Sequence, residues 1–141
     1  MIKIKNYQLE NVALFLKNAK LTGQVSRYRT RLLKKIVARI QELAEEEANI
    51  VTDNNFEVDE KGNIVQKVQT KDAGREMAKL NKELTEIKQE RSIFEEDTEQ
   101  EFSKLEGALN EYEEKLAGDE AEAYDILLDA FEEGRERESN H

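Results

Sequence analysis

Apolar residues in the first fifty positions recur at intervals of three and four, the spacing of amphipathic helices. This spacing predicts a helix over about residues 7–21, which Gly23 would end as a left-handed residue. A second helix is predicted from the cap residue Ser26 to about residue 50. The short link favours an antiparallel hairpin of these two helices at the N-terminus. The apolar positions that define the pair are Leu9, Val12, Ala13 and Leu16, then Tyr28, Leu32, Ile36, Ile40 and Leu43.

The pattern changes to alternation in the middle of the chain. Phe56 and Val58 alternate with charged residues, and Ile64 and Val65 follow a turn that contains Gly62. Two β-prone runs around such a turn predict a small β-hairpin. A solitary hairpin is marginal in water, so we expect this one to pack on helices or to gain another strand.

Two heptad seams follow from Thr70 onward and are out of phase, because 15 residues rather than 14 separate Ile87 from Phe102. Either one long helix contains a stutter, or two helices flank a short strand. The β-prone pair Ile93-Phe94 and the capping candidate Thr98 favour the break. The first seam is Ala73, Met77, Leu80, Leu84 and Ile87, and the second is Phe102, Leu105, Leu109, Tyr112 and Leu116.

The last helix is predicted to begin at the cap residue Asp119, after Gly118 has closed the preceding helix. Gly134 would stop it, and residues 135–141 would form a disordered tail. We therefore expect a mainly α protein with one domain over residues 1–134. It would contain about five helices, namely the two of the N-terminal helical hairpin, two heptad-patterned helices and one C-terminal amphipathic helix. A small β-hairpin or short β-sheet would complete the fold.

Composition excludes several kinds of chemistry. The 141 residues include no Cys, and the single histidine is His141. Disulfides, cysteine zinc sites and a Ser-His-Asp triad are therefore excluded. An EF-hand register around Gly62 fails, because Lys61 would stand fifth and Val68 would replace the bidentate glutamate. We expect no enzyme activity, no cofactor and no metal site.

Charge is divided unequally along the chain. Residues 1–41 carry ten Lys or Arg and one Glu, which gives a net charge of +9. Residues 42–141 carry twelve Lys or Arg and thirty-one Asp or Glu, which gives a net charge of −19. The net charge of the whole chain is therefore −10. The cations in the first turns of the second predicted helix oppose the dipole of that helix. We therefore expect them to interact with charges outside it. They would either pair with acids of residues 72–138 or contact phosphates, and the negative total disfavours a polyanion. The candidate basic face is Arg27, Arg29, Arg31, Lys34 and Lys35.

Residues 92–141 carry eighteen acids against four bases. This segment is either a solvated helix face or a surface that imitates a nucleic-acid backbone and occupies the basic groove of a partner. The candidate acidic face is Glu111, Glu113, Glu114, Asp119 and Glu122.

The heptad seams could pack within the chain or against a second copy, as a homodimer. Each spans about two heptads, short of a free coiled coil, so intramolecular packing is favoured. No apolar run is long enough for a bilayer span, and residues 1–5 lack the apolar region of a signal peptide. We expect a cytoplasmic protein with no membrane partner.

Three segments resemble a family of small proteins from phages and prophages of Gram-positive bacteria, classed as a domain of unknown function. They are Ile2-Lys3-Ile4-Lys5-Asn6-Tyr7-Gln8-Leu9, Ser26-Arg27-Tyr28-Arg29-Thr30-Arg31 and Ala117-Gly118-Asp119-Glu120-Ala121-Glu122-Ala123-Tyr124-Asp125. The resemblance implies a phage accessory protein made in the cytoplasm of the bacterial host. It supplies no catalytic residue.

Three hypotheses for function follow. The first is a non-enzymatic phage accessory protein that binds a phage or host protein in assembly, at the lysis stage or in host takeover. The second is an acidic inhibitor of a bacterial antiphage defence nuclease, an anti-CRISPR-like mimic of nucleic acid. The third is a nucleic-acid binder that uses the face from Arg27 to Arg39.

Overall fold

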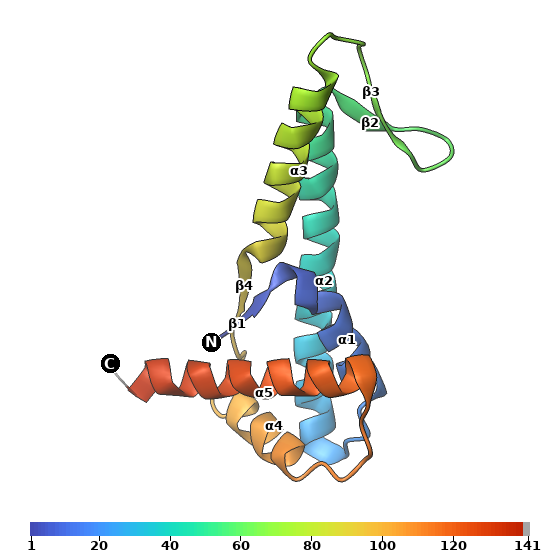
Figure 1. Ribbon diagram of the computed structural model, residues 1–141. Coiled ribbons are helices and arrows are strands. Elements are labelled where there is room, and N and C mark those ends of the chain that lie inside the picture. Colours follow the sequence, from blue (N-terminus) through green and yellow to red (C-terminus); the bar gives the residue numbers. More distant parts are fainter. Residues whose placement is uncertain (140–141) are drawn as a thin grey trace. The chain divides into compact units, whose positions relative to one another are not determined.

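The computed structural model describes residues 1–139 and divides the chain into two compact units (Figure 1). Residues 1–40 and those from 91 onward form one, here called the terminal unit; residues 41–90 form the other, the central unit. Helix α2, Gly23–Asp53, contributes its first part to the terminal unit and its last part to the central unit. The described residues pack as these two units, and one domain over residues 1–134 stays a prediction.

The terminal unit is mainly helical, and its longest continuous element is the C-terminal helix. Helix α5 packs against α1, β1 and α4. The short 3₁₀ turn η1 joins β1 to α1. In chain order, the elements are β1 Ile2–Lys5, η1 Asn6–Gln8, α1 Leu9–Asn18, the first part of α2, β4 Arg91–Phe94, α4 Glu101–Asn110 and α5 Gly118–Ser139.

A two-stranded sheet ties the N-terminus to the segment after residue 90. Strand β1 alternates isoleucine and lysine, so that Ile2 and Ile4 are both buried while the lysines lie on the opposite face. It pairs antiparallel with β4, where Ile2 lies opposite Phe94. The break between the two heptad seams is thereby confirmed as a short strand between helices. The β1 partner of that strand was not predicted.

The core of the terminal unit consists of apolar side chains from all its main elements. Burying each such side chain contributes roughly 1.5–3 kcal/mol. Phe15 extends this core as an aromatic cluster, since its ring meets Tyr112 and Tyr124 edge-on at 6.1 and 5.7 Å. The apolar side chains of this unit with at most 2% exposure are Ile2, Ile4, Leu9, Val12, Phe15, Leu16, Leu32, Ile36, Leu105, Leu109, Ala123 and Leu127.

Two glycines lie at helix ends other than those predicted. Gly23 and Gly118 have φ angles of +59° and +58°, which favour glycine, and each is the first residue of a helix. The sequence predicted both as helix stops. Helix α4 also ends early, at Asn110, so Tyr112 and Leu116 lie in the following loop rather than on a second heptad seam.

Gly134 does not stop the last helix, as the sequence predicted, but lies inside it. A Cβ atom there would lie 2.4 Å from the carbonyl oxygen of Met1, so only glycine lets α5 approach the start of β1 this closely. The helix continues to Ser139. The disordered tail predicted over residues 135–141 is therefore wrong for residues 135–139, and residues 140–141 lie outside the described part.

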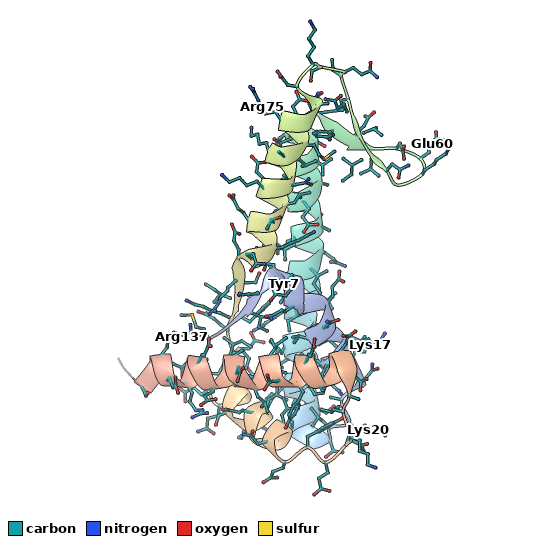
Figure 2. All side chains as sticks on the ribbon, viewed as in Figure 1. Tyr7, Lys17, Lys20, Glu60, Arg75 and Arg137 are labelled. Atoms are coloured by element: carbon teal, nitrogen blue, oxygen red, sulfur yellow. The ribbon has the colours of Figure 1, made fainter. Side chains whose placement is uncertain are left out.

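The central unit is a helical pair capped by a hairpin. Strand β2, Phe56–Val58, pairs antiparallel with β3, Ile64–Gln66, and Glu60 lies in the turn between them (Figure 2). Helix α3, Ala73–Gln89, follows. The predicted hairpin and its packing on helices are confirmed, because Phe56 is 2% exposed within an apolar cluster. That cluster is Val51, Phe56 and Leu80, flanked by Ile50, Met77 and Leu84.

The helical parts of both seams pack inside their own units, except that Ala73 at the start of α3 is exposed. Leu80 and Ile87 are buried in the central unit, and Leu105 and Leu109 are buried in the terminal unit. Intramolecular packing of the seams is thereby confirmed. A second copy of the chain stays a predicted partner.

Candidate functional site

The basic face predicted on α2 is largely occupied by contacts within the terminal unit. Arg29 reaches the end of α1, where its Nη1 donates hydrogen bonds to the carbonyl oxygens of Leu16 at 3.0 Å and Ala19 at 2.6 Å. Its Nη2 donates to Ser26 Oγ at 2.9 Å. The last carbonyls of a helix lack intrahelical donors and carry partial negative charge. Arg29 therefore satisfies the C-terminus of α1.

Arg31 forms an ion pair with a buried carboxylate. Its Nη1 lies 2.5 Å from Glu101 Oε1, and the Glu101 side chain is 5% exposed. The other carboxylate oxygen accepts the backbone N–H groups of Asp97 and Thr98, both at 2.7 Å. The Thr98 contact is one half of the predicted capping box.

These contacts set the ionisation of both groups. Burial alone would raise the pKa of Glu101, but the hydrogen bonds from Thr98, Arg31 and Asp97 outweigh it and hold that pKa below its ordinary value. The hydrogen bond to Glu101 raises the pKa of Arg31. The pair is therefore ionised at neutral pH.

Two further cations of α2 bind the segment around β4. Lys35 Nζ donates to Asp97 Oδ1 at 2.7 Å and to the Glu95 carbonyl oxygen at 2.6 Å. Arg39 Nε donates to Ser92 Oγ at 2.8 Å. The internal pairing predicted for the basic run is confirmed for Arg31 and Lys35.

The rest of the basic face remains open. Arg27 and Lys34 are exposed, and neither side chain forms an ion pair or hydrogen bond with any residue in the range 1–139. A nucleic acid approaching this face would meet two unengaged cations among the five predicted. Fewer cations are therefore free to contact phosphates than the nucleic-acid hypothesis assumed.

The residues of the predicted acidic face are divided between a loop and a helix. Glu111, Glu113 and Glu114 lie in the exposed loop between α4 and α5 instead of on a helix. Glu114 forms a 3.8 Å ion pair with Lys20, which is labelled in Figure 2. Both side chains are exposed, so the pair adds little to the stability of the fold. The loop is held mainly by Tyr112, whose hydroxyl oxygen accepts the Lys20 backbone N–H at 3.0 Å.

The other two predicted acids lie on α5. Asp119 is exposed in the first turn, where a carboxylate suits the helix dipole. Glu122 is exposed one turn further on and begins a longer row of acids at intervals of three and four residues. That row, here called the acidic ridge, consists of Glu122, Asp125, Asp129, Glu132 and Glu136.

The acidic ridge runs along the outer side of α5. Its five residues are all exposed, whereas the opposite side of the helix carries the buried Ala123, Leu127 and Phe131. At 1.5 Å per residue the ridge is about 21 Å long. None of its carboxylates lies within ion-pair distance of a cation in the described part of the chain. Glu132 and Glu136 nevertheless attract Arg135 electrostatically, and Asp129 lines a small hollow together with Lys3, Lys5 and Arg91.

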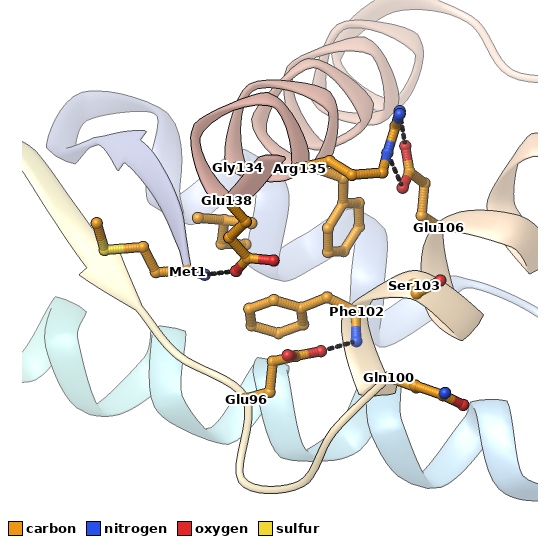
Figure 3. Close-up of a pocket in the computed structure, with 11 residues that line it drawn as sticks. Met1, Glu96, Gln100, Phe102, Ser103, Glu106, Gly134, Arg135 and Glu138 are labelled. Carbon is orange, nitrogen blue, oxygen red and sulfur yellow. Dashed lines mark hydrogen bonds and ion pairs between the residues drawn. The ribbon is translucent and has the colours of Figure 1, made fainter. Parts of the chain in front are cut away.

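A cavity of about 210 Å³ lies between the start of β1, the loop before α4, α4 itself and the end of α5 (Figure 3). Its aromatic wall is the pair Phe102 and Phe131, with ring centroids 5.5 Å apart and planes at 57°. We call this site the Phe102 cavity. Ile2 and Gly134 also line it.

Three carboxylates surround the Phe102 cavity, and they differ in their partners. Glu106 accepts two hydrogen bonds from Arg135, at 3.1 and 2.9 Å, and this contact raises the pKa of Arg135. Glu138 pairs with the amino group of Met1 at 2.9 Å. Glu96 Oε1 accepts the backbone N–H of Phe102 at 2.7 Å (Figure 3). No cation in residues 1–139 pairs with Glu96.

The described residues contain no group of three or more His, Cys, Asp or Glu placed to hold a metal ion. None of the helices in that same range combines the length and apolar character that a bilayer crossing requires.

The fold and these surfaces define a mainly α-helical protein in which several cations of α2 hold neighbouring elements in place, and in which a row of exposed acids runs along α5. The chain belongs to the family described as Protein of unknown function (DUF1617), whose family model matches residues 1–138. No curated protein and no solved structure matches the chain.

Sequence reasoning missed most of the acidic ridge and all of the Phe102 cavity. The ridge had a visible signal, because Asp125, Asp129 and Glu132 fall on the polar side of the same helix whose apolar side was recognised. The cavity had none, because its walls come from both ends of the chain.

Proposed function

We propose that this chain is a non-enzymatic phage accessory protein, from a phage or prophage of Gram-positive bacteria, that acts by binding another protein in the cytoplasm of its host. The partner is a phage or host protein with a basic surface, engaged in assembly, lysis or host takeover. The observation that carries the proposal is the acidic ridge of α5, whose five carboxylates are exposed and unpaired with any described cation.

Stability does not explain the acidic ridge. Like charges three or four residues apart on a helix repel each other, and each such pair costs roughly 0.2–0.5 kcal/mol. The stretch from Asp119 to Glu133 contains no Lys or Arg, and Arg135, which Glu132 and Glu136 attract, relieves this repulsion only at the C-terminal end of the ridge. A basic partner relieves it and, by its complementary potential, is also drawn to the ridge at long range.

The linear form of the ridge supports a second candidate, an acidic inhibitor of an antiphage defence nuclease. Consecutive ridge carboxylates are three or four residues apart, so they rise by about 5 Å along the helix. One strand of DNA places a phosphate about every 3.4 Å along its axis. The ridge alone is therefore sparser than a phosphate strand, and a mimic would need additional acids. Glu111, Glu113 and Glu114 of the neighbouring loop could supply them.

The test is affinity capture by the full tagged chain from bacteria infected with the phage that encodes it. The lysate is treated with nuclease to remove nucleic-acid bridges, and bound proteins are identified by mass spectrometry. The ridge variant loses three charges without losing side-chain size, and the control loses three exposed charges of the central unit. The ridge variant is Asp125→Asn, Asp129→Asn and Glu132→Gln; the control is Glu45→Gln, Glu57→Gln and Glu60→Gln.

We expect one partner to be captured by the wild-type chain and the control, and to be lost from the ridge variant. Its capture should also weaken as salt rises, because exposed charges are screened. Equal recovery by both variants would exclude the ridge as the binding surface. If the partner is a nuclease that competing DNA displaces, the inhibitor function replaces the accessory function.

A further inference from the structure

We propose that the Phe102 cavity receives a single arginine side chain of the partner protein. This inference rests on the proposed function and deepens it, because it names a specific contact beside the general attraction of the acidic ridge. The volume of about 210 Å³ sets the scale. It exceeds the roughly 150 Å³ of a cavity that holds one benzene and falls below the roughly 300 Å³ of pockets for drug-sized ligands. One long side chain fits this range.

The walls favour a flat cation. The accessible ring of the wall is that of Phe102, which is half-buried, and Phe131, only 3% exposed, packs against it. A guanidinium group stacks on such rings and is attracted to their faces. An ammonium group is more strongly hydrated and has no flat surface to stack. The wall therefore selects arginine over lysine.

The charges around the cavity call for one positive charge. Arg135 neutralises Glu106, and the Met1 amino group neutralises Glu138. Glu96 is left with only the backbone N–H of Phe102, which occupies one of its two oxygens. A neutral ligand would leave this carboxylate without a counter-charge, and an anion would be repelled. A guanidinium would both neutralise it and donate to its second oxygen.

The first experiment measures this binding without any partner. The full ¹⁵N-labelled chain is titrated with N-acetyl-arginine methylamide, and its amide resonances are followed by NMR. The lysine analogue and the citrulline analogue are titrated in parallel, since citrulline keeps the shape of arginine without the charge. We expect saturable shifts at Phe102, Ser103 and Gly134 with arginine, and affinity at least about 10-fold weaker with citrulline.

A matched pair of variants tests Glu96 itself. In Glu96→Gln the amide oxygen can still accept the Phe102 N–H, so the start of α4 is preserved and only the charge is lost. Glu99→Gln removes an exposed charge from the same loop, outside the cavity. We expect arginine affinity to fall about 10-fold in the first variant and to stay unchanged in the second.

Several outcomes would overturn the inference. They are no saturable shift with the arginine amide, equal affinity for citrulline or lysine, and equal behaviour of the two variants. Partner capture undiminished by Glu96→Gln would overturn the role of the cavity in binding the partner. Because the titration involves no partner, its failure leaves the test of the acidic ridge intact. Conversely, loss of the ridge result would refute the proposed function while the cavity result stood.

Discussion

Arg29 and Arg27 are two residues apart on α2 and have the same side chain, but the structure gives them opposite roles. Arg29 holds the last carbonyls of α1, whereas Arg27 is exposed. We predict that Arg29→Met destabilises the protein and that Arg27→Met does not. The pair therefore separates a structural role of the basic run from a role in binding phosphate.

The expected magnitude follows from the contacts. A hydrogen bond from a charged group contributes roughly 1.5–3 kcal/mol, and the partly buried bonds of Arg29 to Leu16 and Ala19 belong at the lower end. Together they give about 3 kcal/mol. The released side chain regains about 1 kcal/mol of rotamer freedom, which leaves a net loss of about 2 kcal/mol. Arg27→Met should stay within about 0.5 kcal/mol of wild type.

Urea unfolding followed by far-ultraviolet circular dichroism measures this difference. With a denaturant slope of about 2 kcal/mol/M, Arg29→Met should lower the midpoint by about 1 M and leave the slope unchanged. Arg29→Lys should lie between, because an ammonium keeps the charge but cannot form the same forked contact. Equal midpoints for the Arg29 and Arg27 variants would show that the contact with α1 adds no stability.

Two more predictions concern stability. Because the pKa of Glu101 is depressed, its contacts stabilise the folded state fully above the ordinary carboxyl pKa of roughly 4.3 and lose that effect as acid protonates the group. Wild type should therefore be more stable than Glu101→Gln at pH 7, and urea titrations should show the difference shrinking toward pH 3. A difference that stayed constant with pH would contradict the assignment. Gly134→Ala should lower the thermal midpoint, because the new Cβ would lie 2.4 Å from the Met1 carbonyl oxygen. Gly107→Ala, on α4 with open space around it, should gain up to about 1 kcal/mol from helix propensity, and scanning calorimetry that ranked the two in the other order would refute this packing.

The helix count and the β-hairpin could be predicted because each depends on local periodicity. The phase shift between the heptad seams located the break that strand β4 fills. Helix ends were harder. A left-handed glycine marks a boundary, but Gly23 and Gly118 begin helices where a local rule placed stops. Such a glycine identifies a helix boundary, but it does not tell whether a helix ends before it or begins at it.

Contacts between distant segments account for the remaining differences. Tyr112 leaves the helical seam because its ring packs edge-on against Phe15 and its hydroxyl binds the backbone of Lys20. Position 134 holds a glycine inside a helix because the start of β1 lies too close to it for a side chain. For the candidate sites, charge asymmetry predicted that α2 would be paired internally, but the individual partner of each cation depends on the fold.

The reversed charge pattern of α2 has a physical explanation in its neighbours. The sequence placed Arg29 and Arg31 in the first turns of a helix that begins at Ser26, but α2 begins at Gly23, so both lie beyond its first turn and the dipole of their own helix acts on them only weakly. Arg29, however, lies at the C-terminus of α1, where a cation is favourable, and Arg31 binds Glu101, which begins α4, where an anion is favourable. Each of these two charges thus stabilises the end of another helix. The middle of the basic run is consequently bound into the fold, and the exposed charge left for a partner is the acidic ridge together with Arg27 and Lys34.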